Sequence, residues 1–422
     1  MKDLELSFKQ LIEIDGCTRC GECIQKCPVF MVTNDQRVTA FNALQTTKDW
    51  SICKSWFRKF FLKRRQMDPE RLKDFSQEVY QCTLCGHCEE VCPVNIHSKE
   101  IRISLRKNMV KASLEIPPPG PILENLQKGR NITYPTNNDR LLWLQNMPKI
   151  FRHSSRKTNA EVVYFVGCVA SFFPATYSIP QAMLYLLEKA KVDFGLLGIE
   201  EWCCGWPLIG MGQEEMVYEL MKHNIESVKA MGAKTLVCGC PSCYHVWENL
   251  YPQLSSEKKL PFEVIHSTDY FLRLLKEERI PLHSLEAIVT YHDPCDLGRA
   301  SGIYEAPREI IRMVSGINFV EMRNHKQHAN CCGGGGDLEM FFPKISRDIV
   351  ELKIKEIEET GAEVVLSACQ QCKRTISLNA KKMKKKFRVL DLLELILILS
   401  DPMRALTFEN LLQKSSSTET SS

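Results

Sequence analysis

The sequence predicts an α+β multidomain protein, in which a helical N-terminal domain is followed by two duplicated α/β domains. Three observations predict it. A pattern of five cysteines occurs twice, apolar strand-like runs alternate with helical stretches around it, and a proline-rich break at 116–121 separates this part from a helix-rich N-terminal region. We place the domains at 1–115, 159–285 and 286–414, with a Pro-rich linker at 116–158 and a disordered tail at 415–422.

The composition is that of a soluble globular protein. The chain has 422 residues, of which 44% are hydrophobic and 25% charged, and this length is too great for one ordinary domain. The N-terminus lacks the apolar core of an export signal, so we expect a cytoplasmic protein with reduced cysteines. No apolar stretch approaches the roughly 20 residues that span a bilayer. The run at 392–399 contains Glu394 and predicts a buried helix.

Two cysteine runs in the N-terminal region share the spacing C-x2-C-x2-C-x3-C-P. This spacing binds [4Fe–4S] clusters, and in two-cluster domains the fourth cysteine of each run ligates the other cluster. It is not the spacing of a zinc finger. We therefore predict two cubane [4Fe–4S] clusters, one held by Cys17, Cys20, Cys23 and Cys92 and the other by Cys82, Cys85, Cys88 and Cys27.

The segment between these two runs is long and helix-rich, since 82 − 27 = 55, and it favours a helical ferredoxin-like domain over a compact β-containing one. Within it, Trp56 to Arg65 place apolar and cationic side chains on opposite faces at helical spacing. Such a helix either packs over the clusters of its own domain or docks on a membrane surface or a partner. Cys53, in the same segment, is interpreted as structural.

The duplicated pattern predicts a second kind of site. Its second copy follows the first by 127 to 129 residues (295 − 168 = 127, 331 − 203 = 128, 369 − 240 = 129). Each copy contains two adjacent cysteines followed by glycine, which suits several bridged irons better than one ordinary cubane. The alternatives are two zinc sites or scattered core cysteines. The first set is Cys168, Cys203, Cys204, Cys240 and Cys243, and the second set is Cys295, Cys331, Cys332, Cys369 and Cys372.

Strand-like runs lead into these cysteines. The apolar stretches at 162–166 and 287–291 end just before Cys168 and Cys295, and shorter β-rich runs precede each Cys-x-x-Cys pair. Strands that alternate with helices predict parallel sheets with ligands in the loops at the strand ends. Cys238 lies at the end of one of the strand-like runs, so we interpret it as a buried structural residue.

Charge and glycine content give no sign of a nucleotide or nucleic-acid site. The formal net charge of +4 is offset by thiolate-bound clusters, which are anionic, so it does not predict nucleic-acid binding. The glycine run at 333–336 follows two cysteines directly and lacks the spacing of a phosphate loop or a dinucleotide fingerprint. We expect this run to wrap a cluster, and we expect any flavin or nicotinamide site to lie on a partner.

These motifs resemble those of the CCG-domain (cysteine-rich domain) iron–sulfur oxidoreductase family. The segments Tyr291-His292-Asp293-Pro294-Cys295 and Asn330-Cys331-Cys332-Gly333 are similar to the family's own motifs, and the layout of nearly all of residues 1 to 400 resembles the heterodisulfide reductase D subunit. The resemblance implies that each five-cysteine set holds a noncubane [4Fe–4S] cluster. It further implies that the two clusters reduce a disulfide in two one-electron steps, with electrons supplied by the cubanes.

The resemblance also bears on protons and partners. His292 and His245 are candidate proton donors because histidine titrates near neutrality, although each is alternatively a core residue or a support for a ligand. The same architecture resembles the iron–sulfur subunits of glycolate oxidase and anaerobic glycerol-3-phosphate dehydrogenase, where it conducts electrons from a flavoprotein to the quinone pool. We therefore expect a membrane cytochrome b-type subunit or a flavoprotein dehydrogenase subunit as partner, and peripheral attachment at the inner face of the cell membrane.

Overall fold

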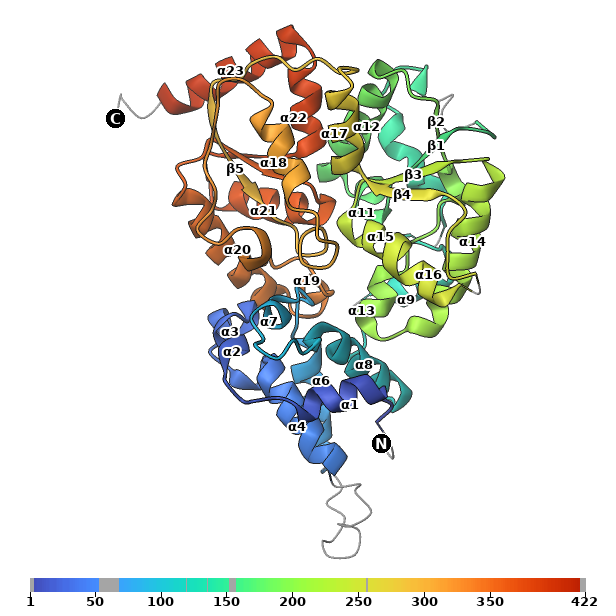
Figure 1. The fold of residues 1–422 in the computed structure, drawn as a ribbon, viewed down its shortest axis with the longest axis vertical. Coiled ribbons are helices and arrows are strands. Elements are labelled where there is room, and N and C mark those ends of the chain that lie inside the picture. The colour runs from blue at the N-terminus through green and yellow to red at the C-terminus, as the bar shows by residue number, and fades with distance from the viewer. Residues whose placement is uncertain are drawn as a thin grey trace, which may run out of the picture. The chain divides into compact units, whose positions relative to one another are not determined.

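The computed structural model describes residues 4–52, 68–118, 120–134, 136–151, 157–255 and 257–417 (Figure 1). The chain divides into two units, each made of three segments. The helical unit comprises Met1–Gly120, Pro207–Val217 and Asn330–Glu351, and the α/β unit comprises Pro121–Trp206, Tyr218–Ala329 and Leu352–Ser422. Two short segments of the predicted α/β domains thus belong to the helical unit, and the predicted linear domain boundaries stay predictions.

The N-terminal part of the helical unit contains helices and no strand over residues 4–52 and 68–118, as predicted for a helical ferredoxin-like domain. Ser7 and Gln10 form a capping box at the start of α1, and Pro28 and Pro69 occupy first-turn positions where a missing N–H costs nothing. The main helices are α1 (Phe8–Asp15), α2 (Glu22–Gln25), α3 (Pro28–Thr33), α4 (Ala40–Ile52), α6 (Pro69–Tyr80), α7 (His87–Glu90) and α8 (Ser98–Lys111).

Apolar side chains from α4, α6 and α8 form the core of the helical unit. Leu44, Phe75, Val79, Leu105 and Met109 are buried together in it. This packing holds the two cysteine-bearing loops on rigid helices. The predicted amphipathic segment from Trp56 to Arg65, together with Cys53, lies outside the described residues.

The α/β unit contains two four-stranded sheets with the same topology. Their strand orders are β2-β1-β3-β4 and β6-β5-β7-β8, and every pairing is parallel, as the alternation of strand and helix predicts. The first sheet consists of β1 (Val162–Phe165), β2 (Phe194–Leu196), β3 (Thr235–Cys238) and β4 (Glu263–His266). The second consists of β5 (Ala287–His292), β6 (Ile317–Phe319), β7 (Val364–Ser367) and β8 (Arg388–Asp391).

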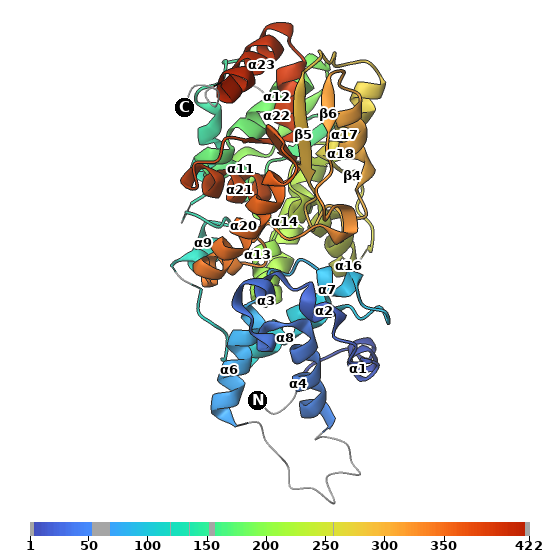
Figure 2. The same ribbon diagram turned by 90° about the vertical axis from the view of Figure 1, so that its left-hand side faces the viewer.

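The two repeats pack through two equivalent pairs of helices, in which the helix after the first strand of one repeat contacts the helix after the fourth strand of the other. Helix α12 (Ser178–Lys189), after the first strand of repeat one, contacts α22 (Leu392–Leu399), after the fourth strand of repeat two. In the same way α17 (Ser267–Lys276), after the fourth strand of repeat one, contacts α18 (Glu305–Arg312), after the first strand of repeat two (Figure 2). The two repeats are therefore related by approximate two-fold symmetry. One continuous apolar core joins them.

Helices of the α/β unit extend into two segments for which the sequence predicts a linker and a tail, 116–158 and 415–422. Helix η2 (Asn138–Leu144) comes from the predicted linker, yet Trp143 and Leu144 are buried in the core of this unit. Helix α22 is buried as predicted and begins with an Asp391–Glu394 capping box. Helix α23 (Pro402–Ser417) enters the predicted tail at 415–422, of which 418–422 lie outside the described residues. Among the described residues, no helix is both long and apolar enough to span a bilayer.

Candidate metal centres

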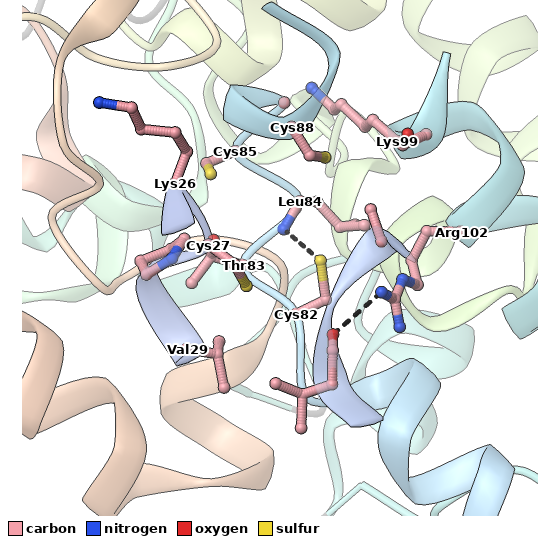
Figure 3. A pocket seen from close by; sticks show the side chains of 15 residues that line it. Lys26, Cys27, Val29, Cys82, Thr83, Leu84, Cys85, Cys88, Lys99 and Arg102 are labelled. Atoms are coloured by element: carbon pink, nitrogen blue, oxygen red, sulfur yellow. Dashed lines mark hydrogen bonds between the residues drawn. The ribbon is translucent and has the colours of Figure 1, made fainter. Parts of the chain in front are cut away.

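Four cysteines from both N-terminal runs line one cavity in the helical unit, which we call the second cavity because three of them belong to the second run. Cys27, which precedes α3, lies with Cys82, Cys85 and Cys88 around it (Figure 3). The backbone N–H of Leu84 donates to Cys82 Sγ at 3.4 Å, the kind of contact that stabilises a thiolate. The structure thus brings the fourth cysteine of the first run beside the first three cysteines of the second.

The reciprocal arrangement occurs at a neighbouring cavity of the same unit, which we call the first cavity. Cys17, Cys20, Cys23 and Cys92 line it, and the backbone N–H of Ile96 donates to Cys92 Sγ at 3.4 Å. Cys88 of the other group lines this cavity as well, so the two cavities are neighbours. Cys20 is exposed, whereas the other three cysteines are partly buried.

The two loops share an uncommon backbone conformation. Arg19 and Leu84 have φ of 60° and 52°, and the glycines two residues later, Gly21 and Gly86, have φ of 84° and 72°. Left-handed conformations are uncommon for residues other than glycine, and they persist where the surroundings impose them. The same values at equivalent positions indicate that both loops are shaped to wrap a group of the same kind.

The donor set of these cavities fits iron–sulfur clusters. Burial raises the pKa of Cys23 to about 11 and that of Cys27 to about 12, and it raises the pKa of Cys88 well above its ordinary value. The protein alone therefore holds these groups as neutral thiols, and a cationic group is needed to retain four neighbouring thiolates. Thiolate-rich sites of this spacing bind [4Fe–4S] clusters.

The first five-cysteine set lies wholly in the α/β unit, and all five residues are buried. Cys168 follows β1, Cys203 and Cys204 lie in the segment after β2, and Cys240 and Cys243 follow β3. Cys168 begins α11 (Cys168–Phe172), and Cys240 and Cys243 flank the start of α15 (Pro241–His245). The thiols form a continuous chain of side-chain hydrogen bonds. Its links join Cys168 to Cys203, Cys203 to Cys204, Cys204 to Cys243, and Cys243 to Cys240.

The loop that carries Cys203 and Cys204 is fixed from several sides. Tyr251 Oη donates to the Cys204 carbonyl at 3.0 Å, and Asn224 Nδ2 donates to the Cys203 carbonyl at 3.2 Å. Gly205, with φ of 91°, donates its N–H to Cys203 Sγ at 3.4 Å. A Cβ at Gly167 would lie 3.2 Å from Cys243 Sγ. Five converging thiols in a cradle lined by glycine fit a cluster of several irons.

Hydrogen bonds set the acidity of the first set. The thiols of Cys203 and Cys243 donate to Cys204 and lower its pKa to about 6. The hydrogen bond with Cys203, together with burial, raises the pKa of Cys168 well above its ordinary value. These two hydrogen bonds therefore favour the thiolate form of Cys204, which lies in the middle of the chain of sulfur atoms.

The second five-cysteine set is divided between the two units. Cys295, Cys369 and Cys372 belong to the α/β unit, where Cys369 caps α21 (Gln370–Lys382) and its Sγ accepts from the Cys372 N–H at 3.4 Å. Cys331 and Cys332 belong to the helical unit. The assembly of these five cysteines into one site stays a prediction.

Within the helical unit, Cys331 lies next to a cysteine of the N-terminal runs. The Cys332 thiol raises the pKa of Cys331 to about 12, and Cys331 also shares a side-chain hydrogen bond with Cys85. The glycine run then packs on the backbone beside Cys82, since a Cβ at Gly336 would lie 2.5 Å from the carbonyl carbon of Thr83. This agrees with our interpretation of the run as backbone that wraps a cluster.

The two candidate histidines differ in environment. His292 ends β5 and is buried; burial lowers its pKa to about 3, and among the described residues its Nδ1 has no hydrogen-bond partner. One of its ring nitrogens lies within 4.8 Å of Cys372 Sγ. His245 is partly buried, its ring packs edge-on against Trp206 at 5.6 Å, and its Nδ1 faces Asn249 Nδ2 at 3.3 Å.

Three buried polar residues around the cysteines were not predicted from the sequence. They are Arg140 and Glu201, which pair near Cys168, and Gln370, which follows Cys369. The sequence does distinguish Glu201, because its counterpart in the second repeat is Ala329 (201 + 128 = 329). The first repeat therefore carries a carboxylate before its adjacent cysteine pair that the second repeat lacks. Cys238, in contrast, is a buried strand residue of β3, as predicted.

Comparisons with known proteins agree with the two kinds of site. The cysteine-rich domain family, CCG, matches residues 162–247 and 289–377, and the 4Fe-4S dicluster domain family matches 13–96. The chain is 34% identical over 397 residues to the D subunit of the dihydromethanophenazine:CoB–CoM heterodisulfide reductase of Methanosarcina acetivorans, with 93% of this chain and 95% of that protein covered.

Two further likenesses are more distant. "EtfAB:quinone oxidoreductase" of Syntrophomonas wolfei is 26% identical over 433 residues, with 93% of this chain and 59% of that protein covered. A crystal structure of a hypothetical protein from Helicobacter pylori has a TM-score of 0.51 at 12% identity, over 95% of this chain and 74% of that chain, and shows a shared fold alone. On its near full-length match to the Methanosarcina protein, the chain belongs to the heterodisulfide reductase D family of iron–sulfur oxidoreductases.

Proposed function

We propose that this oxidoreductase subunit reduces a disulfide between its two five-cysteine sites, each of which holds a noncubane [4Fe–4S] cluster, with electrons from the two cubane clusters. When bound, such clusters supply electrons one at a time. Both repeats carry a complete set of five cysteines, so one site is available for each sulfur of a disulfide. The similarity to the heterodisulfide reductase of Methanosarcina acetivorans supports the same chemistry here.

The observation that carries this proposal is a reciprocal pair of contacts between the repeats. Ser242, between Cys240 and Cys243, donates its hydroxyl to Asp296 Oδ2 at 2.7 Å, next to Cys295. In return, Gln370 at the start of α21 reaches the segment around Cys168 through its side chain. In each repeat, therefore, the start of the helix after the third strand contacts the segment after the first strand of the other repeat.

Gln370 makes the second contact at close range. Its Nε2 donates to the Val166 carbonyl at 2.8 Å, and its Oε1 accepts from the Ala170 N–H at 3.1 Å. A Cβ at Gly167 would lie 3.5 Å from Oε1 of the same side chain. These hydrogen bonds fix the loops of the two cysteine sets against each other, which suits two sites that act on the two ends of one bond.

The cubane cavities supply a route for electrons into this pair. Cys85 of the second cavity shares a hydrogen bond with Cys331 of the second five-cysteine set. Ligands in direct contact give a short path for an electron. We infer that the cubane held by Cys27, Cys82, Cys85 and Cys88 passes electrons to the second five-cysteine site, and that the cubane with the exposed Cys20 receives them from a partner.

Reduction of a disulfide to two thiols also consumes two protons. Of the two candidate histidines, His245 suits this role better, because it is partly exposed and follows Cys243 closely. Burial keeps His292 neutral near pH 7, since its pKa is lowered to about 3. We propose that His245 delivers a proton and that His292 positions the loop of Cys295.

The test is disulfide reduction by the purified chain under anaerobic conditions. Reduced methyl viologen is the electron donor, and the CoB–CoM heterodisulfide, named for the relative, is the probe. The proposal requires two thiols for each disulfide consumed, and it requires this yield to vanish in Cys204→Ser. The control is Cys238→Ala, which removes a buried cysteine outside the five-cysteine sets and leaves the yield unchanged.

The EtfAB:quinone oxidoreductase relative favours a second candidate function. In that case the chain conducts electrons between a flavoprotein and a quinone. The same preparation then forms no thiol, and instead reduces a water-soluble quinone when a reduced electron-transfer flavoprotein is supplied. In either role we propose that the chain works in a complex with a cytochrome b-type subunit or a flavoprotein.

A further inference from the structure

A buried arginine donates to a cysteine of the first five-cysteine set. Arg140 lies in η2, its side chain is 1% exposed, and its Nη2 lies 3.5 Å from Cys168 Sγ. Its other N–H groups bind Glu201 Oε1 at 2.6 Å, Ser171 Oγ at 3.3 Å and Asn137 Oδ1 at 3.1 Å. Four partners hold the planar guanidinium in one orientation, with one edge toward the sulfur.

The counter-charge of Arg140 is held by the backbone before Cys168. Glu201, also 1% exposed, accepts from the backbone N–H groups of Val166 and Gly167, each at 2.8 Å. These residues directly precede Cys168. The pair is neutral as a whole, so it can be buried, but its cationic end faces the cysteine and its anionic end is saturated by the backbone.

The second repeat is built differently at the equivalent positions. The counterpart of Gly167 is Pro294 (167 + 127 = 294), which has no N–H to donate, and the counterpart of Glu201 is Ala329. The buried arginine of this repeat, Arg308, binds both carboxylate oxygens of Asp293 at 2.8 Å. It also binds the carboxylate of Glu321 at 2.6 and 2.9 Å. A carboxylate thus stands two residues before Cys295, where the first repeat has Val166.

We propose that Arg140 is a positioning residue that raises the reduction potential of the first five-cysteine cluster above that of the second. This rests on the proposed function, which places a cluster in each set. Reduction adds one negative charge to a cluster, and hydrogen bonds to its sulfur atoms together with nearby charge set its potential. A buried cation at 3.5 Å from a ligand sulfur is weakly screened and favours the reduced form.

The consequence is an order of electron transfer within the pair. An electron that enters at the second site, beside Cys85, moves to the first site because that site holds it more tightly. The second site is then free to accept the next electron. Both electrons needed for one disulfide are thereby collected on separate sites.

The test is a redox titration of the holoprotein followed by electron paramagnetic resonance. Arg140→Gln should lower the ratio of reduced to oxidised first cluster at a fixed potential about tenfold, which corresponds to about 59 mV for a one-electron couple. The signal that Cys204→Ser removes identifies the first cluster. Arg308→Gln, a buried arginine bound to carboxylates in the other repeat, should leave the potential of the first cluster unchanged.

Glu201→Gln separates this role from a structural one. Removal of the carboxylate leaves the Arg140 charge uncompensated, so the potential of the same cluster should rise. Potentials that are unchanged, or that move in the same direction in both variants, overturn the proposal. If Arg140→Gln loses iron, Glu201→Gln alone tests the proposal: a rise in the potential of the first cluster supports it, and a fall overturns it. Failure of the proposed function differs from all of these results, because the wild type then forms no thiol from the disulfide or lacks the first-cluster signal.

Discussion

Gly336 lies directly against the backbone of Thr83, a residue between two cysteines of the second N-terminal run. A Cβ at Gly336 would come within 2.5 Å of the Thr83 carbonyl carbon, and Gly336 has φ of 60°. The glycine run after Cys332 therefore packs on the loop that lines the second cavity. This contact explains the glycines better than a nucleotide site does.

Gly336→Ala should destabilise the helical unit and weaken the second cubane. The new Cβ clashes with backbone that cannot move away, and the left-handed conformation adds about 1–3 kcal/mol of strain. The measurement is anaerobic chemical unfolding together with the cubane spectrum. The control is Gly361→Ala, which has a similar φ of 66° but no atom within 4 Å of the added Cβ. Equal losses in the two variants would show that the contact with Thr83 is unimportant.

Gln370→Ala should loosen the two repeats from each other. It leaves the buried Val166 carbonyl and Ala170 N–H without partners, at about 1–3 kcal/mol for each group. We expect a lower free energy of unfolding and a slower disulfide reduction. The matched control is Gln371→Ala, on the same helix, where Thr375 and Arg374 of that helix are among the lost partners. A similar effect of both substitutions on the rate would argue against a role for the contact between the repeats.

Asp391→Asn should change the pH dependence of stability. Burial, with the nearby carboxylate of Glu394, raises the pKa of Asp391 from 3.8 to about 8. The unfolded chain therefore loses this proton at a lower pH than the folded chain does. For this reason the free energy of unfolding of the wild type falls as the pH rises from about 4 to 8. The variant lacks this loss, so at pH 9 it should be more stable by at least about 1.4 kcal/mol, the equivalent of one pKa unit. Below pH 4 the two proteins should match.

Asp401→Asn is the control for that experiment. Asp401 also accepts backbone N–H groups at the start of a helix, from Met403 and Arg404, and these bonds lower its pKa. The ionised Asp401 carboxylate stabilises the fold above the pKa that it has in the unfolded chain. This stabilisation is lost as the pH falls through the lower pKa that it has in the folded chain. The two aspartates should therefore show opposite pH dependence. Unfolding curves from pH 3 to 9 measure both, and a common trend would contradict the assignment.

The two adjacent-cysteine pairs should respond differently to serine. Cys204→Ser acts within the α/β unit and should leave both cubane signals intact, because the cubane cysteines all belong to the helical unit and the weakened soft site is local. Cys332→Ser should also perturb the second cubane, since Cys331, hydrogen-bonded to Cys332, contacts Cys85. Paramagnetic resonance of the reduced proteins distinguishes these outcomes. Unchanged cubane signals in both variants would contradict the coupling through Cys331.

Much of the fold follows from local patterns in the sequence. Strand-like runs that end at Cys168 and Cys295 identify the two sheets, and the duplicated spacing identifies their common topology. The crosswise grouping of Cys27 with Cys82 required knowledge of how such runs pair. The proline-rich break coincides with the division between the two units at Gly120 and Pro121. Trp143 and Arg140, within the predicted linker at 116–158, are buried in the α/β unit.

The buried polar contacts could not be predicted in this way. Gln370 and Val166 are 204 residues apart, and their hydrogen bond exists only because the two repeats pack against each other. The pairing of Arg140 with Glu201 likewise depends on the tertiary position of η2. Neither residue type carries a local signal for such a role, since most glutamines and arginines are exposed.

The iron and acid-labile sulfide content of the anaerobically prepared chain tests the account most directly. Two cubane and two noncubane clusters of four irons each require about 16 irons and a similar amount of sulfide in the wild type. Cys204→Ser should retain about 12, with both cubane signals present. A wild-type content of about 8, stoichiometric zinc, or an iron content that Cys204→Ser does not change would contradict the presence of clusters in the five-cysteine sites.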